Sequence, residues 1–287
     1  MKRNRKTERH HYVPQFYLRH WHNERKKLWV HPINGNEFYQ SGSHSVAFEK
    51  GLYATETLQD LQAFDQEADL GKLEALFAPR WSDLFENIAD PRRKKNIARY
   101  LSIQHLRHPS RLEENKKRNF AMLELLSRAP EAQEKIEIQT LDGITSIVRI
   151  KDYRDFLQDP SQNHSIFIWG MRSLTEELSE ILFQRRWGIV ESPSPFFVTS
   201  DSPLKLWRGG AKSPTFGFRT PGTEIFFPIT PQKLLVISDA WPHDSSHISQ
   251  KDFPAFARMT PIPFNVPQIQ AAKRFVFSAT PLIPGII

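Results

Sequence analysis

The middle of the chain carries its apolar residues at helical spacing. Between Glu56 and Phe77 they follow a period near 3.6 residues, which predicts a helix. The positions are Leu58, Leu61, Phe64, Ala68, Leu73, Leu76 and Phe77. Asp90 is a typical N-cap and Pro91 suits a first helical position, so a second helix is expected to begin there. One face of that helix carries Ile97, Tyr100, Leu101 and Gln104.

Further breaks divide this helical middle. His108-Pro109-Ser110 predicts a break, because proline lacks a donor and clashes with the preceding turn. Ser110 and Glu113 form a capping-box pattern that predicts another helix to about Arg128. Apolar residues on either side of Asp142-Gly143, ending with the run 144–150, predict a β-hairpin. A last long helix is expected over 165–185.

Both ends of the chain have the character of strands. At the N-terminal end, the patterns predict strands over 12–21 and 27–31 and an extended piece within 45–53. At the C-terminal end, the expected strands are 187–191, 196–200, 224–229, 233–238 and 274–278. Asn265 is expected to cap a short helix over 266–272.

These elements predict an α+β fold. An N-terminal β-hairpin and a C-terminal β-rich segment should form a sheet that packs on the central helical region, because neither end alone has enough strands for a stable sheet. We expect a single domain over 1–287. Its parts are a basic tail (1–8), a β-hairpin region (9–53), a mainly helical region (54–186) and a β-rich region (187–287).

Composition narrows the class of protein. The 287 residues contain no cysteine, which excludes disulfides, thiolate metal sites and a cysteine nucleophile. No apolar run approaches the ~20 residues of a membrane span. We therefore expect a cytoplasmic protein that does not enter a membrane.

The opening of the chain holds an excess of positive charge. Residues 1–31 contain nine basic and two acidic side chains, a balance of +7 that equals the formal net charge of the whole chain. Five of the eleven histidines also lie here: His10, His11, His20, His22 and His31. A basic segment of this kind favours an anionic partner, and nucleic acid is the partner that we expect.

His10-His11 is the first candidate for chemistry. The His-His-x-x-Pro string resembles the first strand of ββα-metal nucleases, in which one histidine activates water and a neighbour binds the metal. Asn34 or Asn36 and His44 follow in the required order, but a full hairpin separates them from the histidines and no helix follows His44 closely. Neighbours on a strand point to opposite faces, so only one of His10 and His11 is expected to face a given cleft.

Asp201 ends an apolar strand and is the second candidate. In Phe197-Val198-Thr199-Ser200-Asp201-Ser202-Pro203, hydroxyls and a carboxylate come together at a sheet edge, which suits a metal ligand or a general base. The structural alternative is an Asx-turn in which Asp201 bonds its own backbone ahead of Pro203.

A polar stripe on the helix before the proline break is the third candidate. Its residues, Gln104, Arg107, His108 and Arg111, follow the i, i+3, i+4, i+7 pattern. A buried arginine needs an anionic partner, which could be Asp201, Glu67, Glu74 or a ligand phosphate. Glu67 and Glu74 share a helix face and could also hold a divalent metal, although a solvated face is the simpler interpretation.

Three of these segments together resemble a large bacterial family catalogued as a domain of unknown function. They are Arg9–Trp21, with the opening His-His-Tyr-Val-Pro-x-Phe-Tyr-Leu-Arg, the 104–111 region and Phe197–Pro203. Trp29, Tyr53, Asn265 and the Phe227–Pro231 stretch also match. The spacing of Pro109 and Arg111 departs by one residue from the family's Arg-x-Pro-x-x-Arg. The resemblance implies a bacterial or phage-related origin and one shared domain, without an established reaction.

Two classes of function follow from these residues. The first is a metal-assisted hydrolase, nuclease-like and acting on phosphodiesters, with a divalent metal and a cleft built from both chain ends. The second is a non-catalytic module that binds nucleic acid or a protein partner, in the setting of host–phage conflict. The candidate catalytic residues are His10, His11, Gln15, Arg19, Gln104, Arg107 and Asp201, with His11 and Asp201 as metal ligands and Thr199, Ser200, Arg111 and Asn265 as substrate-binding residues.

Removing residues 1–8 tests the role of the basic opening. The deletion takes away four of the nine basic side chains, so any nucleic-acid binding should weaken and its dependence on salt concentration should become less steep. The free energy of unfolding should stay almost unchanged, because terminal residues of this composition rarely join a core. Equal binding by the full-length and truncated proteins across a salt series would refute the idea.

Overall fold

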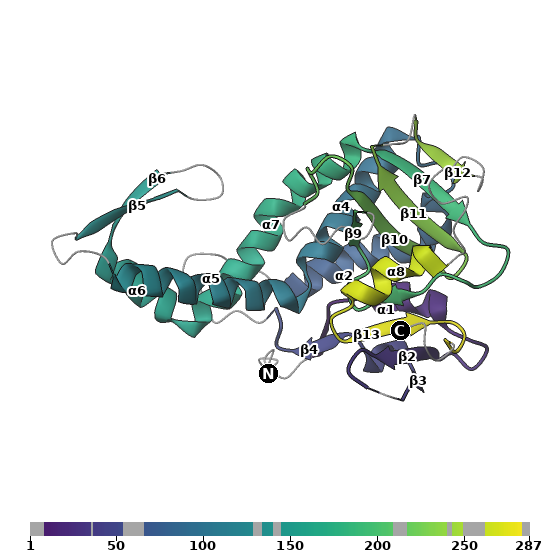
Figure 1. The fold of residues 1–287 in the computed structure, drawn as a ribbon, viewed down its shortest axis with the longest axis horizontal. Coiled ribbons are helices and arrows are strands. Elements are labelled where there is room, and N and C mark those ends of the chain that lie inside the picture. The colour runs from purple at the N-terminus through teal and green to yellow at the C-terminus, as the bar shows by residue number, and fades with distance from the viewer. Residues whose placement is uncertain are drawn as a thin grey trace.

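Strands from both ends of the chain share one sheet in the computed structural model (Figure 1). Its order is β3 (Tyr39–Ser41), β2 (Leu28–Pro32), β13 (Phe275–Ser278) and β8 (Thr199–Ser200). Phe277 pairs with Val30 on one side and with Thr199 on the other, and all of these pairings are antiparallel. The predicted α+β class and the joining of the two ends in one sheet are therefore confirmed.

The structure describes most of the chain. The described residues are 9–35, 37–53, 66–128, 134–139, 145–208, 217–239, 243–248 and 262–282. Within these ranges, no helix has the length and apolar character needed to cross a membrane. The segment 56–65 of the first predicted helix and the Asp142-Gly143 turn lie outside the described residues.

A second, larger sheet forms the centre of the C-terminal part. Its order is β12 (Ser245–Ile248), β7 (Arg186–Glu191), β11 (Lys233–Ser238), β10 (Glu224–Thr230) and β9 (Lys205–Trp207). Only β12 pairs in parallel, with β7, among the described strands of this sheet. The strands β3, β9 and β12 were not predicted, because each is too short to show an alternating pattern.

Both faces of this sheet are covered, which explains why β10 and β11 are almost continuously apolar. Ile225 and Phe227 join the large core that contains the long helices. Phe226 and Val236 join a second cluster with Phe264, on the other face. Alternate residues of a strand point to opposite faces, so burial on both sides requires apolar residues at consecutive positions.

One face of this sheet shares the large core with long helices. They are α2 (Gln66–Phe77), α4 (Pro91–Leu106) and α7 (Pro160–Gln184), with the short α3 (Trp81–Leu84) between α2 and α4. The helix α5 (Pro109–Ser127) packs against α7. The carboxylate of Asp90 accepts hydrogen bonds from the backbone N–H groups of Arg92 and Arg93, at 2.8 and 3.2 Å, as the predicted N-cap requires. The predicted apolar face of α4 is buried.

The break between α4 and α5 falls at the predicted proline, but its cap differs from the prediction. His108, rather than Ser110, is the N-cap of α5, and its Nδ1 accepts the backbone N–H of Ser110 at 3.0 Å. Pro109 then occupies the first helical position, where its missing N–H costs no hydrogen bond.

An arm projects from the helical body (Figure 1). It consists of the end of α5, the helix α6 (Ile150–Gln158), and the predicted hairpin of β5 (Lys135–Gln139) and β6 (Thr145–Arg149). Leu126, Ile150 and Leu157 form its small core. The prediction of a strand to Ile150 ran one residue too far, because Ile150 begins α6, which was missed.

The predicted strand over 12–21 is wrong. After β1 (Arg9–His11), which pairs with β4 (Phe48–Lys50), the chain forms α1 (Gln15–Leu18) and a 3₁₀-helix (Arg19–Trp21). Its aromatic residues favour strands, but helical turns let Tyr17, Leu18 and Trp21 all be fully buried. Burial in the tertiary structure therefore outweighs local β-propensity.

Two further predictions need correction. The predicted strand 196–200 is reduced to β8, and the backbone N–H groups of Phe196 and Phe197 bond instead to the carbonyl of Pro231. Asn265 lies inside α8 (Ile262–Ala271) rather than ahead of a helix. Its side chain bonds instead to the main chain of Phe196 and Val198.

Tyr17 offers a test of how the N-terminal segment is held. Its fully buried hydroxyl donates to the carbonyl of Pro228 and contacts the Thr199 hydroxyl, both at 2.7 Å. Tyr17→Phe should therefore lower the free energy of unfolding by about 1–3 kcal/mol in chemical denaturation, because buried polar partners lose their bond. Tyr39→Phe, at a tyrosine that is 46% exposed, is the matched control and should change it little. Equal stability of the two variants would contradict this account.

Candidate functional site

The N-terminal motif, Arg9–Trp21, packs against the end of α4, and its main-chain carbonyls accept hydrogen bonds from side chains there. Gln104 donates from Nε2 to the carbonyl of Tyr12 at 2.8 Å, and Arg107 donates from Nη2 to the carbonyl of His11. Both side chains are almost fully buried. Three of the candidate residues, His11, Gln104 and Arg107, thus lie together, but the contacts are to main-chain atoms of the N-terminal segment.

Arg107 is neutralised by a carboxylate of the protein itself. Its Nη1 lies 2.8 Å from Oε1 of Glu74, and its Nε lies 3.2 Å from the Tyr53 hydroxyl. The Tyr53 hydroxyl in turn donates to the carbonyl of Arg107. Glu74, one of the partners considered from sequence, therefore forms an internal ion pair with Arg107.

His10 and His11 point to different environments. His10 is 3% exposed, accepts the backbone N–H of Tyr53 on Nδ1 at 2.9 Å, and stacks on the Tyr53 ring. His11 is partly exposed, with Gln15 Nε2 at 3.4 Å from its Nδ1 and the His44 carbonyl at 3.3 Å from its Nε2. Burial lowers the pKa of His11, so its neutral form is favoured at pH 7. The more accessible histidine of the pair is thus His11.

Asp201 connects the end of β8 to the start of β13. Its Oδ1 accepts the backbone N–H of Lys273 at 2.9 Å, and its Oδ2 accepts that of Arg274 at 2.6 Å. The side chain is fully buried, and burial raises the pKa of the carboxyl, while these main-chain donors oppose that effect. The partners lie far along the chain, so the Asx-turn expected with Pro203 is not the interaction that holds Asp201.

The proposed substrate-binding residues around Asp201 also make internal contacts. The Thr199 hydroxyl forms a hydrogen bond with the Tyr17 hydroxyl, and the Ser200 hydroxyl donates to Gln268 Oε1 at 2.8 Å. Asn265 accepts the N–H of Val198 and donates to the carbonyl of Phe196, both at 3.0 Å. These bonds attach α8 to the segment that leads into β8.

The remaining predictions concern Arg19 and a metal ion bound by His11 and Asp201. Arg19 is exposed on the 3₁₀-helix. Within the described ranges, no group of three or more histidine, aspartate or glutamate side chains is arranged to hold a metal ion. Both oxygens of Asp201 accept main-chain hydrogen bonds that help to shape the fold.

Lys205 is a buried cation that the sequence analysis missed. It is 4% exposed, and its Nζ donates to the carbonyl of Ala271 at 2.5 Å. Burial lowers the pKa of Lys205 to about 7, and the positive charges of Lys273 and Arg111 act in the same direction, while Asp201 opposes them. The sequence contained one indication of this burial, because Lys205 lies in the short apolar strand β9, four residues after Asp201.

His108 lies among the same charges. It is 5% exposed, and burial lowers its pKa to about 3, with further lowering by Lys205 and Lys273. Its Nε2 has no hydrogen-bond partner among the described residues, and the same is true of Gln104 Oε1. Unpaired buried polar atoms are uncommon in folded proteins. The presence of two of them within five residues therefore distinguishes the C-terminal end of α4 as a candidate binding region.

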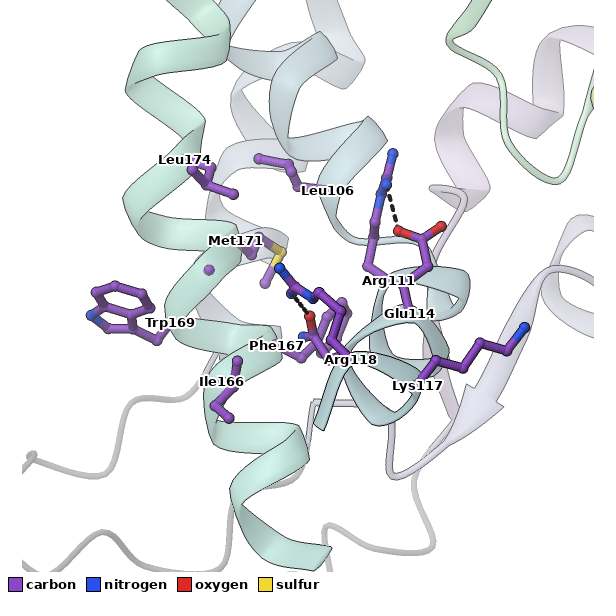
Figure 2. Close-up of a pocket in the computed structure, with 12 residues that line it drawn as sticks. Leu106, Arg111, Glu114, Lys117, Arg118, Ile166, Phe167, Trp169, Met171 and Leu174 are labelled. Atoms are coloured by element: carbon purple, nitrogen blue, oxygen red, sulfur yellow. Dashed lines mark hydrogen bonds and ion pairs between the residues drawn. The ribbon is translucent and has the colours of Figure 1, made fainter. Parts of the chain in front are cut away.

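A surface groove runs along α7, facing α5 at one end and the end of α4 and β9 at the other. It is made of two cavities of about 450 and 430 Å³ that share Leu106, Arg111 and Leu174. The larger one is lined on the α7 side by apolar residues, among them Phe167 and Met171. Figure 2 shows Arg118 extending from α5 toward α7 across this space, whereas Trp169 and Lys117 point away from it.

Comparison with known proteins places the chain in a family. A family model described as "Protein of unknown function (DUF4238)" matches residues 9–281. The chain belongs to this family. No curated protein and no solved structure matches it. Membership in DUF4238 confirms the family type expected from the sequence, and the match covers every candidate residue discussed above.

Asp201→Asn tests whether this carboxylate is part of the framework. A carboxamide can accept only one of the two backbone N–H bonds, so the variant should lose about 1–3 kcal/mol of unfolding free energy. Asp69→Asn, in an exposed pair with Lys72, is the control and should lose much less. Both variants can be compared by urea denaturation. An unchanged midpoint for Asp201→Asn would show that the two amide bonds contribute nothing to the fold.

Proposed function

We propose that this DUF4238 protein binds single-stranded nucleic acid along the groove between α5 and α7. In this arrangement, the basic residues of α5 contact the phosphates and the apolar wall contributed by α7 contacts the bases. This is the second of the two functional classes expected from the sequence. The observation that carries it is the combination, in one groove, of arginine side chains with an apolar floor.

Two arginines of the groove are available to an anionic ligand. Arg111 and Arg118 line the larger cavity together with Glu114, and Glu177 lines the second one. Arg111 pairs with Glu114 at 2.7 Å, and Arg118 bonds the neutral side-chain oxygen of Asn115. Exposed ion pairs of this kind contribute little free energy, so a phosphate can replace Glu114 as the partner of Arg111.

The floor of the groove provides an apolar surface on which bases can pack. Leu106, Leu174 and Met171 line it, and the second cavity extends it to Leu206 and Phe218. Proteins that bind single strands combine a positively charged groove with apolar or aromatic surfaces on which bases pack. A double helix would present its bases only at groove edges, so the apolar floor favours a single strand.

Two candidate residues of the hydrolase class already serve the fold. A hydrolase requires a group that activates water or a metal that does so. Asp201, the leading candidate for either role, accepts hydrogen bonds from two main-chain N–H groups. Arg107 forms an ion pair with Glu74. Binding of a nucleic acid strand requires only accessible cations and an apolar surface for the bases. We therefore propose binding rather than hydrolysis.

A charge-matched pair of double variants tests the proposal. Arg111→Gln/Arg118→Gln removes two charges from the groove, and Arg80→Gln/Arg92→Gln removes two arginines from exposed surface outside it. Binding of a labelled oligonucleotide of about 12 nucleotides is measured by fluorescence anisotropy over a salt series. The groove variant should bind more weakly, with a salt slope smaller by about 0.7 for each phosphate that the protein no longer neutralises. The control variant should match the wild type.

Two results would count against the proposal. One is equal weakening by both double variants, which would show only a general effect of net charge. The other is unchanged affinity in the groove variant. Recovery of the intact oligonucleotide after incubation with Mg²⁺ or Mn²⁺ separates binding from phosphodiester hydrolysis in the same samples.

A further inference from the structure

Gly170 interrupts the apolar face that α7 presents to the groove. Ile166, Phe167, Met171 and Leu174 line the larger cavity, and Gly170 lines it between them. These positions follow the spacing of residues that share one face of a helix. Because glycine has no side chain, the main chain of α7 itself forms the wall of the cavity at this point.

The packing of the protein does not require a glycine at position 170. A Cβ atom built there would have no described heavy atom within 4 Å, apart from its own helical turn and its chain neighbours. Among the described residues, the glycines with a positive φ angle are Gly51 and Gly222, so Gly170 has a backbone conformation that any residue can adopt. The two usual structural reasons for a glycine, close packing and a left-handed backbone, are therefore both absent.

A glycine at this position also makes the fold less stable. Gly170 lies far from either end of α7 (Pro160–Gln184). Inside a helix, glycine is less favourable than alanine, because it loses more backbone freedom on folding, and the difference changes the ratio of folded to unfolded protein by about fivefold. Glycine is also the residue that lets a ligand approach the main chain closely. A destabilising glycine that faces a cavity is thus explained by contact with a ligand.

We propose that Gly170 is the floor of a subsite that holds one base of the strand bound in the groove. This inference rests on the proposed function and makes it more specific, since it places a base against a defined stretch of main chain. Phe167 lies about one turn before Gly170 and Leu174 about one turn after it, so their side chains border the open position. A planar ring can then lie directly on the backbone of α7.

The surroundings of Gly170 favour a base over a phosphate. Phe167 and Met171 are almost fully buried and offer only apolar atoms and a thioether. The arginines of the cavity, Arg111 and Arg118, come from α5 on its other side (Figure 2). Within a helix, the main-chain N–H groups are already bonded to carbonyls of the preceding turn, so they offer a phosphate no donor. The face of a base needs no donor and packs on such a surface.

Substitution of Gly170 should change stability and binding in opposite directions. Gly170→Ala and Gly170→Leu place a side chain in open space and improve helix propensity, so the midpoint of urea denaturation should rise in both. The new side chain occupies the position of the base. The affinity for a labelled oligonucleotide of about 12 nucleotides should therefore fall, by about tenfold for leucine and by less for alanine.

Gly71 provides a matched control on another helix. It lies within α2, is exposed, has no described heavy atom within 4 Å of a built Cβ, and lines neither cavity of the groove. Gly71→Ala and Gly71→Leu should therefore raise the urea midpoint in the same way. Their affinity for the oligonucleotide should match that of the wild type.

A strand without bases tests which part of the ligand contacts Gly170. An oligomer of the same length, built from abasic residues, keeps the phosphates and removes every base. The wild type should bind it more weakly than the intact strand, because base packing is lost. Gly170→Leu should bind the abasic strand as well as the wild type does, since the leucine then displaces nothing.

The outcomes separate this inference from the proposed function. Wild-type affinity of Gly170→Leu for the intact strand, with binding still weakened by Arg111→Gln/Arg118→Gln, would overturn the subsite and leave groove binding intact. Equal weakening of the intact and abasic strands by Gly170→Leu would assign the position to the sugar-phosphate chain and overturn the base assignment. A lower urea midpoint for Gly170→Ala would show that the fold itself needs the glycine, which also contradicts the inference. Absence of binding to every oligonucleotide would overturn both proposals.

Discussion

The docking of residues 12–21 is the interaction on which the rest of the structure depends. Tyr17 and Trp21 are completely buried, and each satisfies its polar atom on a distant segment. Tyr17 bonds to Thr199 and Pro228, and the indole N–H of Trp21 donates to the carbonyl of Phe197 at 3.1 Å. One short helical stretch thus joins both sheets.

The polar residues of the motif region complete this docking. Gln104 and Arg107 fix the backbone of Tyr12 and His11 to α4, and Asp201 fixes β8 to β13. Buried groups of this kind stabilise a fold only when every partner is present, because an unpaired buried group carries a large penalty. The motif residues therefore act as a framework. Two atoms within it, Gln104 Oε1 and His108 Nε2, have no hydrogen-bond partner among the described residues.

Local signals in the sequence predicted the local features of the fold. The N-cap at Asp90 and the break at Pro109 depend on a few neighbouring residues, and both were confirmed. The segment 12–21 was misread because its aromatic residues favour a strand in isolation, whereas its helical form depends on the core that surrounds it.

The contacts of the candidate residues could not be predicted in the same way. Asp201 bonds to residues more than seventy positions away, and four partners were open for Arg107 until the packing of α2 placed Glu74 beside it. The burial of Lys205 depends likewise on α8, which contributes the carbonyl of Ala271. Residue type identified Gln104, Arg107 and Asp201 as candidates, but only their three-dimensional partners distinguish a framework from a binding site.

Native-state hydrogen exchange is the most direct measurement of the framework claim. If residues 12–21 join the two sheets, the slowest amide protons of Tyr17, Leu18 and Trp21 should exchange only through global unfolding, with the same free energy as those of β10 and β11. Exchange of that segment at a much lower free energy, while the five-stranded sheet stays protected, would contradict the account. It would show that the segment can detach without the rest of the fold.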